Sequence, residues 1–457
     1  MKSLPFLKTS RSAIVIEPVT KAAIAGKASP LNAREKKWAI ANGFEGKSGQ
    51  VLLMPGENGT VERVVFGFSG SDNPLNVGAL AKTLPEGTYV LSDQFPDPYL
   101  SSLGWGLGGY AFSKYHAKDG KSAMLTLPKG VDAKALTCEV EATYLARDLI
   151  NTPANDMGPD GLEAEIRALG KANKASVTVI KGDVLLKKNF PMIHAVGRAS
   201  VDAPRLIDLK WGNTKHPKVT LVGKGVIFDS GGLNIKPGNS MALMKKDMGG
   251  AANTIALAKM IMEAKLPIRL RLLVPAVENA IAGNAFRPGD ILPSRKGISV
   301  EIGNTDAEGR LILGDALALG DEEKPDLMID MATLTGAARV ALGPDLPPIY
   351  TDDDEFADRL AIASNETLDP LWRMPLWDPY QKMLASKVAD VNHISTGGFA
   401  GSITAALFLS RFVEKANTWA HLDIYGWTPS AKPWAPVGGE AQGIRALYKA
   451  IRERYRV

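Results

Sequence analysis

Hydrophobic and polar positions alternate in short runs along the first 130 residues of the chain. Short runs rich in β-branched and aromatic side chains predict strands, and runs with apolar residues three to four positions apart predict helices. The expected strands are 12–18, 50–54, 61–68, 88–91 and 122–127, and the expected helices are 34–42, 75–84 and 99–115. Strands and helices that alternate at this scale predict a small α/β domain.

A longer helical pattern covers residues 133–150, where apolar side chains form a stripe along one face. The stripe consists of Leu136, Val140, Tyr144, Ala146 and Leu149. The pattern ends just before Pro153, because a proline disfavours helical backbone at the residue that precedes it. We interpret residues 133–152 as a connector helix between an N-terminal domain, 1–132, and a larger C-terminal domain, 153–457.

Beyond the connector the apolar runs become more continuous. Strands of this kind are typical of sheets that helices cover on both faces. The expected strands are 206–209, 219–222, 268–274, 300–302, 327–331 and 419–424, and the expected helices are 162–171, 251–264, 310–319 and 404–416. Glycine and proline cluster at 223–238 and 283–289. Loops that follow strands are where α/β proteins place their chemistry, so these stretches are the first to search for a site.

Length and charge narrow the class of protein. At 457 residues the chain exceeds what one core usually supports, and 45% hydrophobic with 23% charged residues is typical of a folded globular protein. The net charge of +5 is too small to indicate a dedicated nucleic-acid-binding protein. The single cysteine, Cys138, excludes an intramolecular disulfide. Because we find no long apolar run and no signal-peptide pattern, we expect a cytoplasmic protein that has no membrane partner.

The segment 304–311, NTDAEGRL, follows an expected strand and carries two acids and a base. If its centre is extended, Asp306 and Glu308 point to the same side, because side chains alternate along a strand. Arg310 follows on that side if the extension continues. Two buried carboxylates close together cost free energy unless a cation lies between them. The segment therefore predicts a divalent metal site.

A second set of charged residues lies in the glycine-rich stretch 222–252. It consists of Lys224, Asp229, Lys236 and Asp247. Each of them singly has an ordinary structural explanation, such as a helix N-cap for Asp247 or surface charge for the lysines. Together with 304–311, so many charged residues at strand ends in glycine-rich loops favour a functional site.

Longer motifs contain both sets: VGKGVIFDSGGLNIKP at 222–237, MKKDMGGAA at 244–252 and NTDAEGRL at 304–311. Further motifs are NTPAND at 151–156, ENAIAGNAFRPGD at 278–290, DMATLTGA at 330–337 and WAHLDI at 419–424. In order and spacing these resemble the leucyl aminopeptidase family, the cytosol aminopeptidases with two metals. The resemblance covers about residues 140–450. It implies an α/β protein with a small N-terminal α/β (macro-like) domain and a larger catalytic domain, in which helices flank a central mixed sheet.

The resemblance also implies two divalent metal ions in each subunit. The matching ligands are Lys224, Asp229, Asp247, Asp306 and Glu308. Asp229 and Glu308 would bridge both ions, Asp306 would complete one site, and Lys224 with Asp247 the other. Oxygen ligands with one nitrogen suit Mn²⁺, Zn²⁺, Mg²⁺ or Co²⁺ without choosing among them. A lysine ligates only as a neutral amine, so we expect burial and the metal to lower the pKa of Lys224.

The function that the resemblance implies is a metal-dependent aminopeptidase, which releases N-terminal amino acids from peptides with a free N-terminus. The family mechanism uses a water that two metals activate. Lys236 would stabilise the oxyanion, and Arg310 would hold a bicarbonate ion as the general base. Members of the family are homohexamers, which we carry over as an expectation.

By family position, the residues that bind the first side chain and hold the peptide are Met244, Thr333, Leu334 and Gly336. An apolar pocket with a methionine predicts a preference for leucine and other apolar residues. The sequence departs from the commoner family pattern at Gly314, at Ala338 and Arg339, and at 441–443. The last departure would reshape the pocket wall, so the resemblance does not predict a strict preference for leucine.

Two other functions are weaker alternatives. A two-metal phosphoesterase would share the carboxylates, but such enzymes normally add histidine ligands, and the five histidines show no metal-binding spacing. DNA binding is possible as a second role, although no helix shows a basic stripe that would support it.

Overall fold

The computed structural model describes residues 4–8, 10, 12–26, 29–56, 58–116 and 123–455. Residue 122, where one expected strand begins, and the outer limits 1 and 457 of the two expected domains lie outside the described residues. The chain forms two compact units. One comprises Met1–Tyr144 and Ser430–Val437, and the other comprises Leu145–Pro429 and Gly438–Val457. The division falls within helix α5 (Ala133–Asn151).

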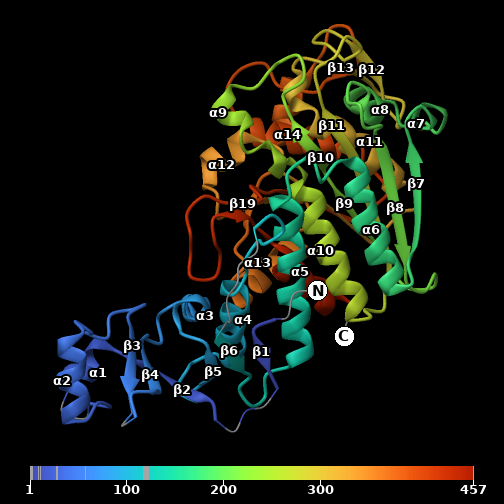
Figure 1. Cartoon of the computed structure of the whole chain (residues 1–457). Helices are drawn as coiled ribbons and strands as arrows, with labels where there is room; N and C mark the ends of the chain where they lie inside the picture. The colour runs from blue at the N-terminus through green and yellow to red at the C-terminus, as the bar shows by residue number, and fades with distance from the viewer. Residues whose placement is uncertain are drawn as a thin grey trace. The chain divides into compact units, whose positions relative to one another are not determined.

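The first unit contains a six-stranded sheet in the order β1-β6-β5-β2-β4-β3 (Figure 1). Only β3 is antiparallel to its neighbour. The strands are β1 (Phe6–Leu7), β2 (Ile14–Val19), β3 (Val51–Pro55), β4 (Val61–Gly67), β5 (Gly87–Leu91) and β6 (Ala123–Thr126). The helices are α1 (Lys21–Ala25), α2 (Ala33–Ala41), η1 (Pro74–Ala79), α3 (Leu80–Thr83) and α4 (Pro98–Gly108). Phe66, Tyr89 and Trp105 are fully buried in its core, as expected for a small α/β domain.

The second unit is built on a nine-stranded mixed sheet in the order β16-β15-β18-β14-β9-β11-β8-β7, with β10 paired to β11. The central strands β18, β14, β9 and β11 are parallel, and β8 and β7 run antiparallel to their neighbours. At the other edge, β15 is antiparallel to β18 and parallel to β16. The strands are β7 (Ser176–Lys181), β8 (Arg205–Trp211), β9 (Lys218–Gly223), β10 (Gly225–Asp229), β11 (Arg269–Asn279), β14 (Leu327–Ala332), β15 (Pro348–Tyr350), β16 (Trp372–Met374) and β18 (Thr418–Asp423). The predicted central mixed sheet is therefore confirmed.

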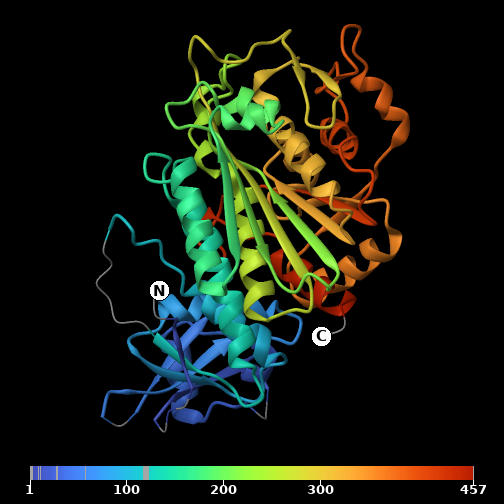
Figure 2. The same cartoon turned by 90° about the vertical axis from the view of Figure 1, so that its right-hand side faces the viewer.

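Helices pack on both faces of this sheet, with α6 and α10 on one face and α8 and α11 on the other (Figure 2). The longer helices are α6 (Pro159–Asn173), α10 (Gly249–Glu263), α11 (Gly309–Asp321), α13 (Asp354–Glu366), α14 (Gly401–Ser410) and α15 (Ile444–Arg454). The shorter ones are α7 (Val184–Lys187), α8 (Pro191–Gly197), α9 (Gly238–Met241), η2 (Met244–Met248), η3 (Thr305–Ala307), α12 (Gly336–Leu342) and η4 (Asp378–Leu384). Two small sheets consist of β12 (Ile291–Pro293), β13 (Ser299–Glu301) and β17 (Val391–Asn392), and of β19 (Trp427–Thr428) and β20 (Gly438–Gly439).

Burial explains why the central strands read as continuous apolar runs. All six residues of β14 and all six of β18 are buried, because helices cover both faces of the sheet. At the start of α10, a Cβ atom on Gly250 would lie 2.0 Å from the carbonyl oxygen of Met331 in β14. Glycine therefore allows the helix to begin against the sheet, which places η2 at the ends of the parallel strands.

No helix in the described part of the chain combines the length and the apolar character that crossing a bilayer requires.

Candidate active site

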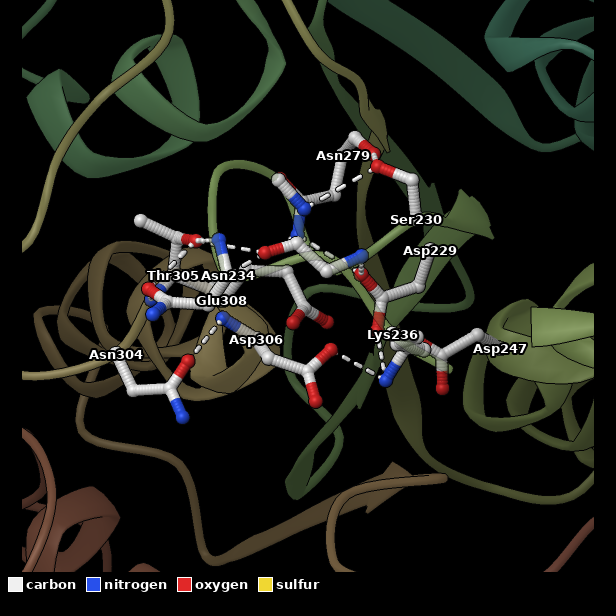
Figure 3. Close-up of polar contacts among 12 residues, drawn as sticks. Asp229, Ser230, Asn234, Lys236, Asp247, Asn279, Asn304, Thr305, Asp306 and Glu308 are labelled. Carbon is white, nitrogen blue, oxygen red and sulfur yellow. Dashed lines mark hydrogen bonds and ion pairs between the residues drawn. The ribbon is translucent and has the colours of Figure 1, made fainter. Parts of the chain in front are cut away.

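The charged residues of the stretches 222–252 and 304–311 converge beyond the ends of neighbouring strands (Figure 3). Lys224 directly follows β9, Asp229 ends β10, Lys236 lies in the loop after β10, Asp247 lies in η2, Asp306 lies in η3, and Glu308 precedes α11. The order of the strands in the sheet brings together residues that are up to 84 positions apart, from 224 to 308.

The prediction that residues 305–309 are extended is wrong. Thr305–Ala307 form the 3₁₀ turn η3, and Gly309 begins α11. The side chain of Asn304 accepts a hydrogen bond of 2.8 Å from the backbone N of Asp306, which caps the start of the turn. A Cβ atom on Gly309 would lie 2.5 Å from Cε of Lys224, so glycine lets the helix start against that lysine without displacing its side chain. Asp306 and Glu308 therefore approach the site from a turn and a helix start.

Three carboxylates, which we call the carboxylate cluster, meet at this place: Asp229, Asp306 and Glu308. Each offers an oxygen, and these oxygens lie within 4.8 Å of one another. Burial and then the charge of Asp229 raise the pKa of Glu308 well above its ordinary value, and the same two causes raise the pKa of Asp306. Both carboxylate oxygens of Glu308 are buried without a hydrogen-bond partner among the described residues. Crowded acidic oxygens of this kind fit a divalent cation.

Two lysines carry positive charge into the cluster. Lys224 Nζ lies 2.7 Å from Asp247 Oδ2 and 3.0 Å from Glu308 Oε1. Lys236 Nζ lies 2.7 Å from Asp229 Oδ2 and 2.5 Å from Asp306 Oδ1 (Figure 3). Each ammonium group therefore contacts two carboxylates. A metal ion bound to the same carboxylates would take a similar place.

The pKa of Lys224 shows how strong this pairing is. Burial lowers the pKa, as we expected, but the charges of Asp247, Glu308 and Asp229 raise it further, so its net direction is upward. Lys236 shows the same balance, because burial lowers its pKa while Asp229 and Glu308 raise it above the ordinary value. A neutral Lys224 amine therefore requires a cation that satisfies those carboxylates in place of the proton.

A set of uncharged side chains holds the cluster in position. Asn279 Nδ2 donates to Asp229 Oδ1 at 2.8 Å and to the carbonyl oxygen of Thr305 at 3.0 Å. The Thr305 hydroxyl donates to the carbonyl oxygen of Gly231 at 2.6 Å, and the Thr305 backbone N donates to Asn234 Oδ1 at 2.8 Å. These bonds join the end of β11, the glycine-rich loop and η3 into one support for the carboxylates.

Asp247 does not cap α10, contrary to its ordinary structural explanation. No side chain caps that helix, and Asp247 Oδ1 instead accepts a hydrogen bond of 2.8 Å from the hydroxyl of Thr333. Its other oxygen, Oδ2, faces Lys224. The residue is buried and directed at the site.

A cavity of about 380 Å³ opens beside the carboxylates. Its lining includes the three residues expected at the first side chain, Met244, Thr333 and Gly336, and also Leu334, which we expected to hold the peptide. Lys236 and Asp306 line the same cavity. The charged centre and the predicted substrate residues therefore share one space.

Two family models match this chain. The model described as "Cytosol aminopeptidase family, catalytic domain" matches residues 144–448, and the model described as "M17 aminopeptidase, N-terminal domain" matches residues 14–128. The chain belongs to the cytosol aminopeptidase family. Members of this family are metal-dependent exopeptidases, so the chain is a metallo-aminopeptidase, a hydrolase that acts on peptides.

Individual proteins are similar to this chain over most of its length. The probable cytosol aminopeptidase of Roseiflexus castenholzii is 40% identical over 399 residues, which are 83% of this chain and 80% of that protein. The crystal structure of cytosol aminopeptidase from Coxiella burnetii has a TM-score of 0.95 at 46% identity, and covers 99% of this chain and 100% of that one. The bottromycin maturation enzyme BotP in complex with Mn has a TM-score of 0.88 at 31% identity, with 97% and 100% coverage. Two α/β domains, as the sequence predicts, are thereby confirmed.

Arg310 of this aminopeptidase lies on the first turn of α11 and is buried. Its Nη1 donates to the carbonyl oxygen of His393 at 2.9 Å, and its Nε has no hydrogen-bond partner among the described residues. Burial lowers the pKa of Arg310 to about 10. The pKa of His393 is lowered to about 3, because this imidazole is buried and lies near the charge of Arg310. The structure therefore gives Arg310 a neutral imidazole as neighbour and leaves part of its guanidinium available for another acceptor.

The sequence analysis missed several residues that shape the cavity of this aminopeptidase. Lys246, Asp423 and Tyr425 line it, and so does Arg339, which was noted only as a departure from the family pattern. Gln442, in the other departure, accepts hydrogen bonds from the backbone N of Tyr425 at 3.0 Å and donates to the carbonyl oxygen of Pro344 at 2.7 Å. The unusual residue types at 339 and 442 were the available signal, but their shared neighbour Tyr425 could not be inferred from sequence.

Proposed function

We propose that this aminopeptidase releases the N-terminal residue of peptides with a free N-terminus, at two divalent ions. The observation that carries the proposal is the carboxylate cluster, whose oxygens lie within 4.8 Å of one another and from which Asp229 and Asp306 line a cavity of about 380 Å³. Asp229 and Glu308 would hold both ions. Asp306 would complete one site, and Lys224 with Asp247 would complete the other.

The residues fit this assignment because the ammonium groups of Lys224 and Lys236 now neutralise the same carboxylates that would bind the ions. Lys224 Nζ lies between Asp247 and Glu308, and one divalent ion would take over both carboxylates. When bound, the ions would lower the pKa of a water molecule and polarise the scissile carbonyl. Oxygen donors with one amine suit Mn²⁺, Zn²⁺, Mg²⁺ or Co²⁺. The Mn bound to BotP, at 31% identity, supports Mn²⁺ as the first ion to try.

We assign the catalytic contacts to Lys236 and Arg310. Lys236 lines the cavity, and its ammonium would stabilise the negative charge that develops on the substrate's carbonyl oxygen. Arg310 would hold a bicarbonate ion, since a planar guanidinium suits a planar anion, and that ion would accept the proton from the nucleophile. The unpartnered Nε of Arg310 supports this role.

The first side chain of the peptide would lie against Met244, Thr333 and Gly336, with Leu334 beside the peptide backbone. A methionine wall favours leucine and similar apolar side chains with modest discrimination. Following the family, we propose a homohexamer in the cytoplasm, and sedimentation at the monomer mass of 48.8 kDa would contradict the hexamer.

Hydrolysis of leucine p-nitroanilide tests the proposed function. The enzyme is stripped with EDTA and assayed with and without Mn²⁺, beside the variant Glu308→Ala and an N-acetylated substrate. We expect Mn²⁺ to restore activity in the wild type only, and no turnover of the blocked substrate. Hydrolysis of the acetylated substrate, or full activity of Glu308→Ala, would contradict the proposal. A stripped protein that binds no divalent ion would contradict all five ligand assignments.

A further inference from the structure

Four basic side chains line the cavity, and they differ in whether a carboxylate lies within ion-pair distance of each. Lys224 and Lys236 each form ion pairs with two carboxylates. Lys246 and Arg339 line the same cavity, and neither forms an ion pair with a carboxylate in the described part of the chain. The second pair therefore has no direct carboxylate partner among the described residues, unlike Lys224 and Lys236.

Lys246 is the more unusual of the two, because only 6% of its surface is exposed. Its Nζ lies 4.6 Å from the centroid of the Tyr425 ring, and no described residue offers it a hydrogen bond or an ion pair. A cation over a tyrosine ring is stabilised only in part, and burying an ammonium without an acceptor is costly. A buried, unpartnered donor that lines a cavity indicates a ligand that brings the acceptor.

The acidic residues nearest to Lys246 are already occupied. Asp247 accepts from Thr333 through Oδ1 and faces Lys224 through Oδ2. Asp423 Oδ1 accepts from the backbone N of Leu334 at 2.9 Å and of Thr335 at 3.1 Å, and its Oδ2 accepts from the Thr335 hydroxyl at 2.6 Å. The oxygens of both carboxylates therefore already have partners, and neither carboxylate forms an ion pair with Lys246 among the described residues.

Arg339 approaches the same tyrosine. It lies on α12, one helical turn after Gly336, and its side chain is exposed. Its Cζ lies 5.4 Å from the centroid of the Tyr425 ring, and its Nη1 donates to the Tyr425 hydroxyl at 3.5 Å. Gln442 fixes the tyrosine by accepting from its backbone N. We call Lys246, Tyr425 and Arg339 the cationic wall.

From this geometry, and resting on the proposed function, we infer that the cationic wall binds the side-chain carboxylate of an acidic N-terminal residue, glutamate or aspartate. Met244 and Gly336, which line the pocket for the first side chain, lie two and three residues from Lys246 and Arg339. The methylene groups of a glutamate can pack on Met244 while its carboxylate accepts hydrogen bonds from the wall. Acidic residues therefore join the apolar ones in the substrate range of this enzyme.

The test compares glutamyl, glutaminyl and leucyl p-nitroanilides on the Mn²⁺-loaded enzyme. Glutamate and glutamine have the same shape and differ in charge, and an anilide has no C-terminal carboxylate, so a difference must come from the side chain. A hydrogen bond to a charged acceptor is worth more than one to a neutral amide, so we expect kcat/KM to favour glutamate about tenfold. The difference should reside mainly in KM, since the carboxylate lies away from the reacting bond.

Two variants locate the effect. Lys246→Met should reduce the glutamate-to-glutamine ratio towards one. Arg339→Glu, at an exposed position that tolerates the change, should reduce the ratio and raise turnover of the lysyl anilide relative to the glutamyl anilide, by about tenfold. Lys245→Met is the matched control, since Lys245 donates to the carbonyl oxygen of Asn151 and is not part of the cavity lining. Its glutamate-to-glutamine ratio should equal that of the wild type.

Several results would overturn the inference. Equal kcat/KM for the glutamyl and glutaminyl anilides in the wild type would show that the wall does not bind the carboxylate of the first side chain. Leucyl turnover in the same sample would leave the proposed function intact. A ratio that is unchanged in both Lys246→Met and Arg339→Glu would also refute it. Preference for a free dipeptide over its C-terminal amide, without a glutamate preference, would assign the wall to the peptide's C-terminus instead. Loss of every anilide activity with bound Mn²⁺ would contradict the proposed function itself.

Discussion

Asp229 and Asp306 of the carboxylate cluster line the same cavity as the cationic wall, yet the charges of the two regions are paired in different ways. At the cluster, Lys224 and Lys236 each contact two carboxylates, so each of these carboxylates has a cationic partner within the protein. In the wall, Lys246 and Arg339 share the face of one tyrosine. A balanced network can fold by itself and exchange its internal cations for metal ions, whereas an unbalanced charge is explained best by a ligand that arrives later.

The largest effect expected from breaking the cluster is on activity. Asp229→Asn removes a carboxylate proposed to hold both ions, and we expect kcat/KM to fall by at least about 10⁴-fold. Elemental analysis should show less than two metal ions in each chain. Asp208→Asn is the control, because Asp208 pairs with Arg271 in the sheet and is not part of the cavity lining. Normal activity of Asp229→Asn would contradict the ligand assignment.

The contribution of the lysine–carboxylate ion pairs to stability can be tested on the metal-free protein. Lys224→Met leaves Asp247 and Glu308 buried beside each other without their shared cation, so we expect the free energy of unfolding in EDTA to fall by about 3–5 kcal/mol. Denaturant unfolding measures this. The control Lys210→Met breaks a half-buried pair with Glu323, far less buried than the pairs of Lys224, and should cost about 1 kcal/mol. Equal losses in both variants would show that the buried pairing contributes nothing special.

The uncharged support of the cluster should matter less than the ligands. Asn279→Ala removes two hydrogen bonds that orient Asp229 and Thr305, and we expect Mn²⁺ affinity to weaken by about 10–100-fold. Titration calorimetry of the stripped enzyme checks this. Asn284→Ala, at an exposed asparagine of the following loop, should retain wild-type affinity. Wild-type affinity in Asn279→Ala would remove Asn279 from the support.

The smallest expected effect has the opposite sign. Lys246→Met replaces a buried and unpartnered ammonium with an apolar side chain of similar length, so the free energy of unfolding should rise by about 1 kcal/mol. The same denaturant experiment in EDTA places it beside Lys224→Met. A loss of stability in Lys246→Met would show that the two regions do not differ in charge balance.

The pattern of hydrophobic and polar residues predicted best those strands that are buried on both faces. The expected strands 219–222 and 327–331 correspond to β9 and β14, because burial on both faces requires continuous apolar sequence. The edge strand β7 was not predicted, since several of its residues are exposed and its pattern is weak. Helix α15 was missed as well, although its buried positions are regularly spaced.

The candidate site was predictable in its residue types and less so in its shape. Lysines and acids at strand ends indicated a metal centre, but the 3₁₀ turn at 305–307 depends on the Asn304 cap and on Gly309 packing against Lys224. The cationic wall joins Lys246, Arg339 and Tyr425, which are up to 179 positions apart, from 246 to 425. Such proximity follows from the order of the strands in the sheet, which no local pattern contains.

The turn η2 has a consequence for how enzymes of this design can diverge. Within the five residues Met244–Met248 it supplies Met244, Lys246 of the cationic wall and the proposed metal ligand Asp247. Gly250, at the start of the next helix, packs against β14. An insertion or deletion here would displace Asp247 together with the selectivity residues. New substrate preferences in this lineage are therefore expected to arise by point substitution at positions such as 246, with the length of the segment held constant.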